Sequence, residues 1–398
     1  MATNITPYKI SIPRADVERL DRKLRDVRLA DEIDGCTGER GPPIQDVRRL
    51  VGHWREAFNW YDFEERLNQL PNFEATISID GFEAFQLHFL HQRSSSPDAI
   101  PLLFVHGWPG SFYEVTKILP LLTNGGPTVF HIVAPSLPNF GYSSRIDKPG
   151  FGMKQYAQTL HELMLSLGYE NYATQGGDWG SSITRLMGTL YPSVRALHLN
   201  LVVATPPPPN APVTFVRFLA THFLNLYTRS EAVGLQKAQS YQGDGNGYFE
   251  IQKQRPTTIG IALEDSPVGL LSWMYDKLVA WTDEYPWTDD EVCEWVSLYW
   301  FSRAGPAASV MIYHEAFKGE HVASASTFAP GTKVGLSYFP QEMFRTPNLW
   351  NKQIGEVVFE REHERGGHFA AWEQPEALAG DLRDMFSKGR SARAAFKK

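Results

Sequence analysis

Apolar residues at helical spacing mark the first part of the chain. They recur every three or four positions over residues 13–28, with Leu20 and Leu24 on one face, and again from residue 44 to about residue 70. Two amphipathic helices are therefore predicted there. They are expected to precede any strand of a parallel sheet.

A change to strand composition follows these helices. Residues 76–79 and 82–90 are predicted strands, and Asp80-Gly81 between them is a pair typical of the tight type I′ turn. The sequence therefore predicts an antiparallel hairpin with a two-residue connection.

Continuous apolar runs then replace this pattern, as is typical of strands covered on both faces. The predicted strands are residues 101–105, 129–134, 172–175, 194–203, 333–339 and 357–361. Helical spacing appears over residues 153–167 and 182–191, and Gly168 and Pro192 are expected to end these two helices. Strands and helices in alternation indicate a mostly parallel sheet with crossover helices.

The run Pro206-Pro207-Pro208-Pro209 interrupts this order. About a hundred aromatic-rich residues of helical character follow it and are interpreted as a lid inserted on the sheet. The basic residues 388–398 are expected to form a solvated, frayed tail. The predicted units are residues 1–95, an N-terminal extension with the first hairpin; 96–203, the first part of the core; 204–318, the helical lid; and 319–398, the second part of the core.

Composition indicates a globular protein of a reducing compartment. Of the 398 residues, 42% are hydrophobic, which excludes a disordered chain, and Cys36 and Cys293 are too few for a disulfide framework. A net charge of −7 gives no electrostatic reason to expect nucleic acid as a partner. The sequence contains no signal peptide and no apolar run of about 20 residues, so a soluble, cytoplasmic protein without a membrane anchor is expected.

The segment Gly176-Gly177-Asp178-Trp179-Gly180 has the pattern of a nucleophile elbow, in which a strand turns sharply into a helix. Small residues on both sides allow the backbone to fold tightly and project the central side chain. Serine is usual at the centre, but Asp178 stands there. Because aspartate is already anionic at neutral pH, it can attack a saturated carbon and form an alkyl ester.

The loop His106-Gly107-Trp108-Pro109-Gly110 follows the first buried strand. In folds with an elbow, this loop and the residue after the nucleophile each supply a backbone N–H to an oxyanion hole. The expected donors are the amides of Trp108 and Trp179, and a cis Trp108-Pro109 bond would aim the first of them. Alone, the loop also fits an ordinary Gly-Pro turn; the elbow 70 residues later favours the catalytic interpretation.

Hydrolysis of an ester on Asp178 requires a base for water and a carboxylate that orients the base. His368, after the last predicted strand, is the expected base, and Glu342, after the preceding one, is the expected acid. His363 is a rival base, but its charged neighbours indicate exposure. The rival acids Glu373 and Asp384 come after His368, in what is predicted to be a terminal helix.

With these motifs in place, the chain resembles the epoxide hydrolases of the α/β-hydrolase superfamily, specifically their microsomal-type branch, along nearly its whole length. The resemblance rests on five segments in order: Trp60-Tyr61-Asp62-Phe63, Asn68-Gln69-Leu70-Pro71, His106-Gly107-Trp108-Pro109, Gly177-Asp178-Trp179-Gly180 and Gly366-Gly367-His368-Phe369-Ala370. It implies an α/β-hydrolase fold with a mostly parallel central sheet, a helical lid and an N-terminal helical extension. It also implies hydrolysis of epoxides to vicinal diols, without a metal or cofactor.

The resemblance further implies two lid tyrosines that bind the epoxide oxygen, and Tyr248 and Tyr313 match them. A phenol with a pKa near 10 stays protonated at neutral pH and can donate to an alkoxide. Tyr241, Tyr275 and Tyr299 are rivals within the lid. In the loop of residues 138–142, Asn139 stands where relatives often have glycine, which is expected to affect the loop conformation alone.

Partners and role follow from the same resemblance. Five lid tryptophans are compatible with a small apolar or aryl epoxide as substrate, although packing of the lid is the better explanation for any single one: Trp273, Trp281, Trp287, Trp295 and Trp300. The N-terminal segment is similar to one that contributes to dimer contacts in relatives, so a homodimer is expected. Detoxification or catabolism of aromatic hydrocarbons is the expected role.

Two alternatives from other classes stay open at this point. A haloalkane dehalogenase uses the same aspartate nucleophile, but it needs no proton for its leaving group, and Trp108 replaces the asparagine common in dehalogenases. A non-catalytic binding protein of the same fold is the second alternative. The intact candidates for nucleophile, base and acid argue against it.

Overall fold

The computed structural model describes residues 2–124, 126–319 and 329–396. Its described strands form one nine-stranded sheet in the order β1-β2-β3-β5-β4-β6-β7-β8-β9. The strands are β1 (Ala2–Pro7), β2 (Asn72–Ile77), β3 (Phe85–Gln92), β4 (Ile100–Val105), β5 (Phe130–Pro135), β6 (Tyr172–Gly176), β7 (Val194–Leu199), β8 (Ala329–Tyr338) and β9 (Gly355–Glu362). β1, β2, β3 and β5 pair antiparallel, and every pairing from β5 to β9 is parallel. The prediction of a mostly parallel sheet is confirmed.

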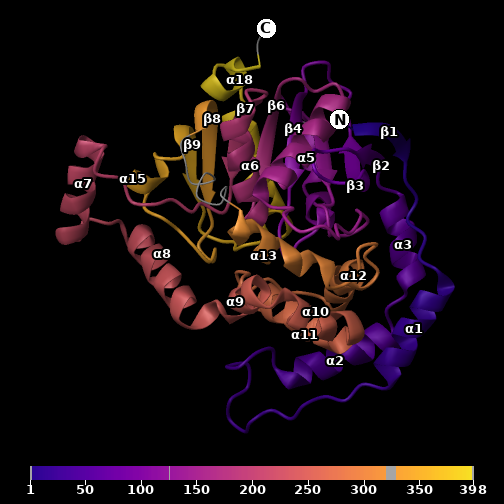
Figure 1. Cartoon of the computed structure of the whole chain (residues 1–398). Helices are drawn as coiled ribbons and strands as arrows, with labels where there is room; N and C mark the ends of the chain where they lie inside the picture. The colour runs from indigo at the N-terminus through magenta and orange to yellow at the C-terminus, as the bar shows by residue number, and fades with distance from the viewer. Residues whose placement is uncertain (1, 125, 320–328, 397–398) are drawn as a thin grey trace.

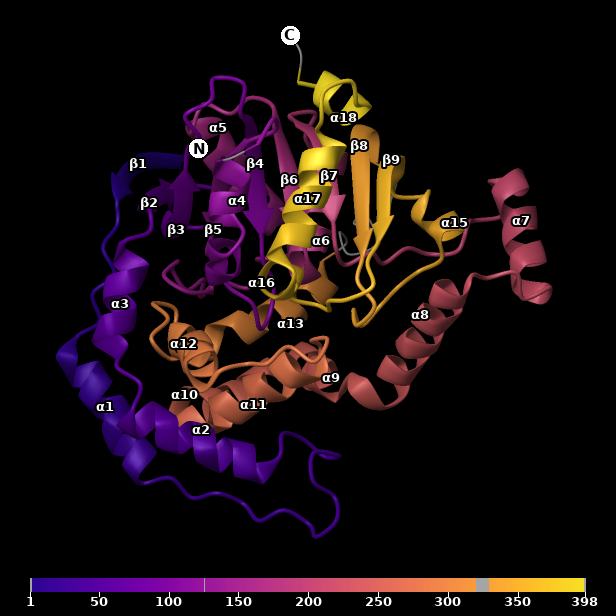
Figure 2. The same ribbon diagram turned by 180° about the vertical axis from the view of Figure 1, so that it is seen from behind.

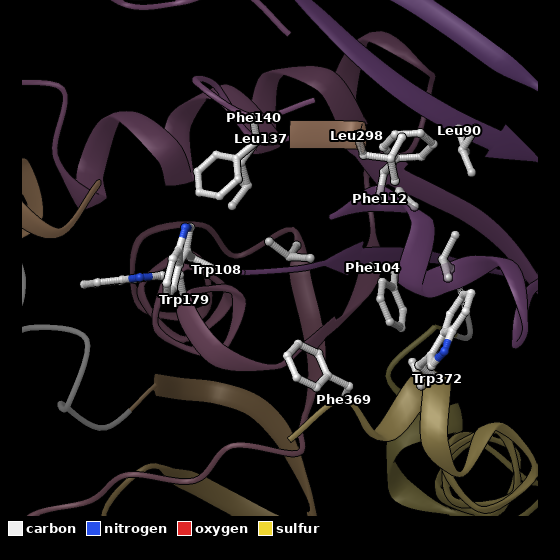
Figure 3. Packing of buried hydrophobic residues seen from close by; sticks show 14 of the residues in the cluster. Leu90, Phe104, Trp108, Phe112, Leu137, Phe140, Trp179, Leu298, Phe369 and Trp372 are labelled. Atoms are coloured by element: carbon white, nitrogen blue, oxygen red, sulfur yellow. The ribbon is translucent and has the colours of Figure 1, made fainter. Parts of the chain in front are cut away.

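Helices cover both faces of the sheet. α5 (Met153–Ser166) and α6 (Asp178–Leu190) lie on one face, and α4 (Leu119–Thr123) and α17 (Pro375–Met385) lie on the other (Figures 1 and 2). Because both faces are covered, every position of β6 is buried, including the polar Thr174 and Gln175. Figure 3 shows part of the resulting core, with Phe104 from β4 near Phe112 and Phe369.

The described residues between Pro206 and Gly319 form helices and no strand, as expected for the lid. These helices are α7 (Pro212–Phe223), α8 (Arg229–Ser240), the π-helical turn η2 (Tyr241–Gly245), α9 (Gly247–Gln254), α10 (Pro256–Asp265), α11 (Pro267–Ala280), α12 (Asp289–Trp300), η3 (Ala308–Val310) and α13 (Met311–Lys318). α9 to α13 lie across the end of the sheet from which the β4 and β6 loops emerge (Figure 1). Trp295 and Tyr299 of α12 donate to the carbonyls of Pro109 and Gly110, which ties the lid to the β4 loop.

The N-terminal helices form an outer layer around the lid (Figure 2). α1 (Arg14–Arg25) and α2 (Ile44–Glu56) contact α11 and α12, and Trp54 of α2 donates to the Ser297 hydroxyl over 3.0 Å. The prediction of one continuous helix over residues 44–70 is wrong. It is broken before α3 (Trp60–Asn68), because the Asn59 side chain accepts from the Tyr61 N–H and starts a new helix.

Three further expectations about the edges are wrong. β1 precedes the helices and pairs with β2, although its polar sequence gave no strand signal. The hairpin has no two-residue turn: residues 78–84 connect β2 to β3, and only Gly81 of the predicted pair has a positive φ, whereas a type I′ turn needs two such residues. In the C-terminal tail, α18 (Ser391–Ala394) is helical and buries Ala392, so this part is not frayed, whereas residues 388–391 are exposed as expected and residues 397–398 lie outside the described residues.

Candidate active site

The elbow holds Asp178 in a conformation that few side chains adopt. Asp178 lies at the start of α6 with φ of 45°, in the left-handed region that is uncommon for residues other than glycine. The neighbouring glycines are needed for close approach. A Cβ on Gly180 would lie 2.0 Å from the Val105 carbonyl oxygen, and one on Gly107 would lie 2.0 Å from Asp178 Oδ1. β4 and β6 therefore bring the two predicted motifs into contact.

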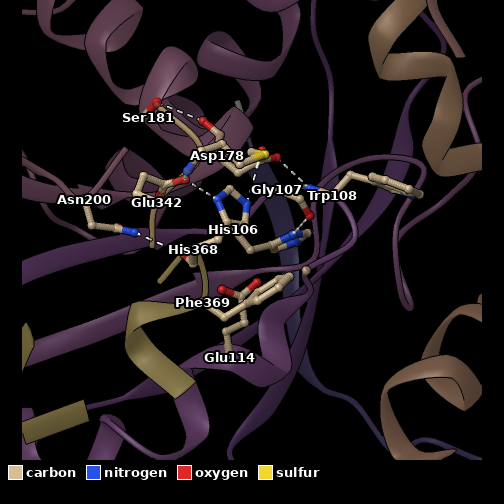
Figure 4. Close-up of polar contacts among 12 residues, drawn as sticks. His106, Gly107, Trp108, Glu114, Asp178, Ser181, Asn200, Glu342, His368 and Phe369 are labelled. Carbon is tan, nitrogen blue, oxygen red and sulfur yellow. Dashed lines mark hydrogen bonds and ion pairs between the residues drawn. The ribbon is translucent and has the colours of Figure 1, made fainter. Parts of the chain in front are cut away.

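The Asp178 carboxylate is held from two sides, as Figure 4 shows. The Trp108 N–H donates to Oδ1 over 2.8 Å, and Oδ2 lies 3.5 Å from His368 Nε2. The Trp108–Pro109 bond is cis. Among the described residues, no amide donates to Oδ2, and the role of the Trp179 amide as a second donor stays a prediction.

His368 and Glu342 are brought together behind Asp178. His368 Nδ1 lies 2.8 Å from Glu342 Oε1, and the His368 amide donates to the Trp281 carbonyl. The side chains of both are almost completely buried, with 2% and 3% of their surface exposed. Burial alone would lower the pKa of His368, but the charges of Glu342 and Asp178 outweigh it and raise the pKa well above 6.5. In this state His368 is a cation between two carboxylates.

The rivals of His368 and Glu342 have other partners. His363 lies 2.6 Å from the buried Asp381, and only 14% of its side chain is exposed, so the expectation that it is exposed is wrong. Glu373 accepts the amides of Phe369 and Asp283, and Asp384 pairs with Arg361.

A second histidine near the elbow has a structural position. His106 Nδ1 lies 2.9 Å from the Gly107 carbonyl, and its Nε2 accepts the Leu137 N–H over 3.1 Å. Burial lowers the pKa of His106 to about 4, so the ring is neutral. These two contacts fix the loop that carries Trp108.

A cavity of about 370 Å³ opens in front of Asp178 and reaches the predicted lid tyrosines. Tyr248 from α9 and Tyr313 from α13 both line it and are buried. The Trp108 ring stacks on Tyr248 at 5.5 Å, and the Trp179 ring meets Tyr313 edge-on at 4.9 Å. Burial raises the pKa of both phenols well above 10, so both remain donors.

Tyr241 is the rival tyrosine that the structure adds to this site. It lines the same cavity from the π-helical turn η2, and its hydroxyl lies 2.8 Å from that of Tyr248. Burial raises its pKa to about 12. Tyr275 and Tyr299 have partners elsewhere, at Asp46 and the Gly110 carbonyl. The sequence offered no signal for the Tyr241 contact, because η2 interrupts the helical periodicity between the two residues.

The walls of the cavity are aromatic, but not through the residues expected from the sequence. None of the five predicted lid tryptophans is among the described residues that line it. The aromatic side chains in the wall are Trp179, Tyr241, Tyr248, Phe249, Tyr313, Phe317 and Phe344. Trp281 instead packs against His368, with ring centroids 5.0 Å apart.

The wall also contains a buried cation. Arg185 lies two turns after Asp178 on α6 and donates to the Val203 carbonyl. Within the described part of the chain, its Nε and Nη2 have no hydrogen-bond partner. Burial lowers its pKa to about 10, which leaves it charged at neutral pH.

The described residues contain no group of three or more histidine, cysteine or acidic side chains arranged to hold a metal ion. Across the same residues, every helix is too short or too polar to cross a bilayer.

Comparison with known sequences identifies the family to which the chain is similar. A family profile described as "Epoxide hydrolase N terminus" matches residues 5–115, and one described as "alpha/beta hydrolase fold" matches residues 100–233. A protein from Stigmatella aurantiaca named "Putative epoxide hydrolase" is 37% identical over 403 residues, which cover 97% of this chain and 86% of the relative.

Solved structures agree with this comparison. The epoxide hydrolase of Aspergillus niger is 32% identical, with a TM-score of 0.82 and 96% of both chains covered. The juvenile hormone epoxide hydrolase of Bombyx mori is 28% identical, with a TM-score of 0.87 over 96% of this chain and 94% of that one. The likeness includes the N-terminal extension, the sheet and the lid.

Proposed function

Because the chain belongs to the epoxide hydrolase family and has its α/β-hydrolase fold, we propose that it converts epoxides to vicinal diols through a covalent ester on Asp178. One observation carries the proposal: the Asp178 carboxylate faces two buried phenols across a cavity while the His368–Glu342 pair lies behind it. This arrangement provides a nucleophile, donors for a leaving oxygen and a base for water.

In the first step, Oδ2 of Asp178 attacks a ring carbon and the carbon–oxygen bond of the epoxide breaks. Oδ2 is the nucleophile because the Trp108 amide occupies Oδ1. Tyr248 and Tyr313 hydrogen-bond the ring oxygen and protonate the alkoxide as it forms. Their raised pKa values keep both phenols protonated before the reaction, which a donor requires.

The ester on Asp178 is uncharged, so the pKa of His368 falls and His368 returns its proton to the phenolate that protonated the alkoxide. In the second step, water attacks the ester carbonyl carbon of Asp178 and gives a proton to Nε2 of the now neutral His368. Negative charge develops on Oδ1, where the Trp108 N–H already donates and where we assign the Trp179 N–H as the second donor. Glu342 holds His368 through Nδ1, so that Nε2 faces the reaction. Collapse of the intermediate releases the diol and restores the carboxylate.

The aromatic wall of the cavity supports a small apolar or aryl epoxide as the substrate. Detoxification or aromatic catabolism, a homodimer and a cytoplasmic location remain proposals. So do the boundaries of the lid at residues 204–318 and of the units on either side. The dehalogenase and the non-catalytic binding protein are not favoured, since neither requires paired phenols opposite the nucleophile.

The test is diol formation from styrene oxide, with rapid-quench mass spectrometry of the peptide that contains Asp178. We expect Asp178→Ala to abolish turnover and His368→Gln to accumulate the ester on that peptide. His363→Gln is the matched control, because this rival histidine lies outside the site, and it should turn over like the wild type. Wild-type turnover by Asp178→Ala, or halide release from a haloalkane without diol formation, would overturn the proposal.

A further inference from the structure

A second, much smaller cavity meets Asp178. It has a volume of about 10 Å³, and its wall includes Gly107, Glu114 and His368. Among the described residues, Asp178 alone lines both this space and the substrate cavity. A space of this size holds about one water molecule. The nucleophile therefore separates a cavity large enough for a substrate from one that fits a single water.

Glu114 enters this small cavity from a short helix. It lies on η1 (Phe112–Thr116), where Ser111 and Glu114 form a capping box and Glu114 Oε1 accepts the Ser111 N–H over 3.1 Å. In the described part of the chain, no hydrogen bond reaches its other oxygen, Oε2. Figure 4 shows the carboxyl group pointing up from η1 toward Phe369 and His368. The cap fixes one oxygen and leaves the other for the cavity.

The charge of this carboxyl group fits a place beside the Asp178 carboxylate. Burial raises the pKa of Glu114 to about 8; the positive charge of His368 opposes this rise and the negative charge of Asp178 adds to it. At neutral pH the group is therefore protonated. Because Oε1 accepts the Ser111 amide, the proton belongs on Oε2, where it can be donated to a water oxygen.

We propose that this cavity holds the water that hydrolyses the ester and that Glu114 is a positioning residue for it. The inference rests on the proposed function and adds where the water is held and by which group. Glu114 Oε2 donates a hydrogen bond to the water oxygen, and the water directs one hydrogen at His368 Nε2. The remaining lone pair of the water then faces the carbonyl carbon of Asp178.

The hydrolysis step balances without further reactants. The O–H bond of the water breaks as its proton passes to His368 Nε2, and the water oxygen forms a bond to Cγ of Asp178. The carbonyl electron pair moves to Oδ1, at the Trp108 N–H. When it returns, the ester bond breaks, and the proton on His368 neutralises the leaving diol oxygen. The second hydrogen of the water, left on the Asp178 carboxyl group, then passes to His368 and restores the carboxylate. Glu114 keeps its own proton throughout.

Rapid-quench measurement of ester formation and ester decay with styrene oxide tests this inference. Glu114→Met removes the hydrogen bond, and we expect decay to slow at least tenfold, while formation stays within threefold of the wild type. Glu114→Gln keeps the cap and places an N–H at the position of Oε2, so decay should stay within threefold. Ser111→Ala is the control for the cap, because Ser111 does not line the cavity; it should lower the melting temperature and leave both steps unchanged.

Three results would overturn the inference. Ester decay in Glu114→Met at the wild-type rate would show that the water needs no such partner. Equal slowing of formation and decay would indicate a displaced Asp178, and decay in Glu114→Gln as slow as in Glu114→Met would show that the hydrogen bond is irrelevant. Absence of an ester in His368→Gln is a different failure, since it rejects the proposed function whatever Glu114 does.

Discussion

Replacing Gly107 with alanine tests how closely the β4 loop and the nucleophile are fitted. A Cβ at this position would lie 2.0 Å from Asp178 Oδ1, about 1.4 Å closer than the 3.4 Å of an ordinary contact. The Asp178 carboxylate must therefore move away by more than 1 Å. Such a movement breaks the 2.8 Å hydrogen bond from the Trp108 N–H and turns Oδ2 away from its line of attack.

The expected decrease in the rate of ester formation can be calculated in two ways. A hydrogen bond to a charged group contributes about 1.5–3 kcal/mol, which corresponds to a rate factor of roughly 10 to 150. A displacement of about 1 Å at a reacting atom costs on the order of 100-fold. Both lead to the expectation that Gly107→Ala slows ester formation about 100-fold.

The assay is single-turnover ester formation with styrene oxide, followed by rapid quench, together with thermal unfolding. Gly52→Ala is the matched control: Gly52 lies on α2, and a Cβ there has no atom within 4 Å. It should keep the wild-type rate and unfold at an equal or slightly higher temperature, because alanine favours a helix. A rate in Gly107→Ala above one third of the wild type, with unchanged unfolding, would refute the placement of Asp178 against this loop.

Three further outcomes are expected. Tyr241→Phe removes the 2.8 Å hydroxyl contact to Tyr248 and should slow ester formation by about threefold to tenfold. This loss should be smaller than that caused by Tyr248→Phe. A loss as large as that of Tyr248→Phe, or larger, would make Tyr241 the principal donor. Burial lowers the pKa of His88 to about 3 and of His106 to about 4. Below a pH of about 6.5 the unfolded chain binds protons that the folded chain does not, so stability is lost as the pH falls from that value toward 3 or 4. Between pH 7 and pH 5 urea unfolding should show a loss of about 2 kcal/mol for each of these histidines, partly offset by His368, whose raised pKa has the opposite sign; unchanged stability would contradict the burial of the two rings. The rate of ester decay should rise with pH. The pH at which it reaches half its maximum should lie below the pH at which His368 titrates in the free enzyme, as measured by NMR. Equal values for these two pH midpoints would contradict a charge effect of Asp178 on His368.

The sheet was largely predictable because its signal is local. Consecutive apolar residues identify a strand covered on both faces, as in β4, and β5 departs from this pattern only at His131. β6 contains Thr174 and Gln175, and its signal was its place directly before the elbow motif. β1 lacked this signal, since it is a polar edge strand that exists through its pairing with β2. The break between α2 and α3 was missed because apolar residues lie on both sides of Asn59, and the cap that starts α3 is a single hydrogen bond from the Tyr61 N–H.

The site residues also fall into two groups, those that the sequence predicts and those that it does not. Asp178, Trp108 and His368 lie in short glycine-rich motifs whose geometry depends on neighbouring residues, and the structure brings them together. Glu114 does not stand out in the sequence, and Tyr241 was only one of three rival tyrosines. Glu114 acquires its place from a cavity closed by the distant His368, and Tyr241 from a π-helical turn that puts its hydroxyl against Tyr248. Such contacts follow from the tertiary structure and leave no periodic trace.

The charge of Asp178 also determines the order of the two steps. In the free enzyme, the carboxylates of Glu342 and Asp178 raise the pKa of His368 and keep it protonated, so it cannot take a proton from water. Formation of the ester removes one of the two charges, and the pKa of His368 falls. His368 then releases one proton, and the phenolate left after protonation of the alkoxide takes up one proton. An elbow serine would be neutral before its reaction and neutral again as an ester, and it could not switch the base in this way. The aspartate is therefore both the nucleophile and the group that holds the base inactive until a substrate is bound to it.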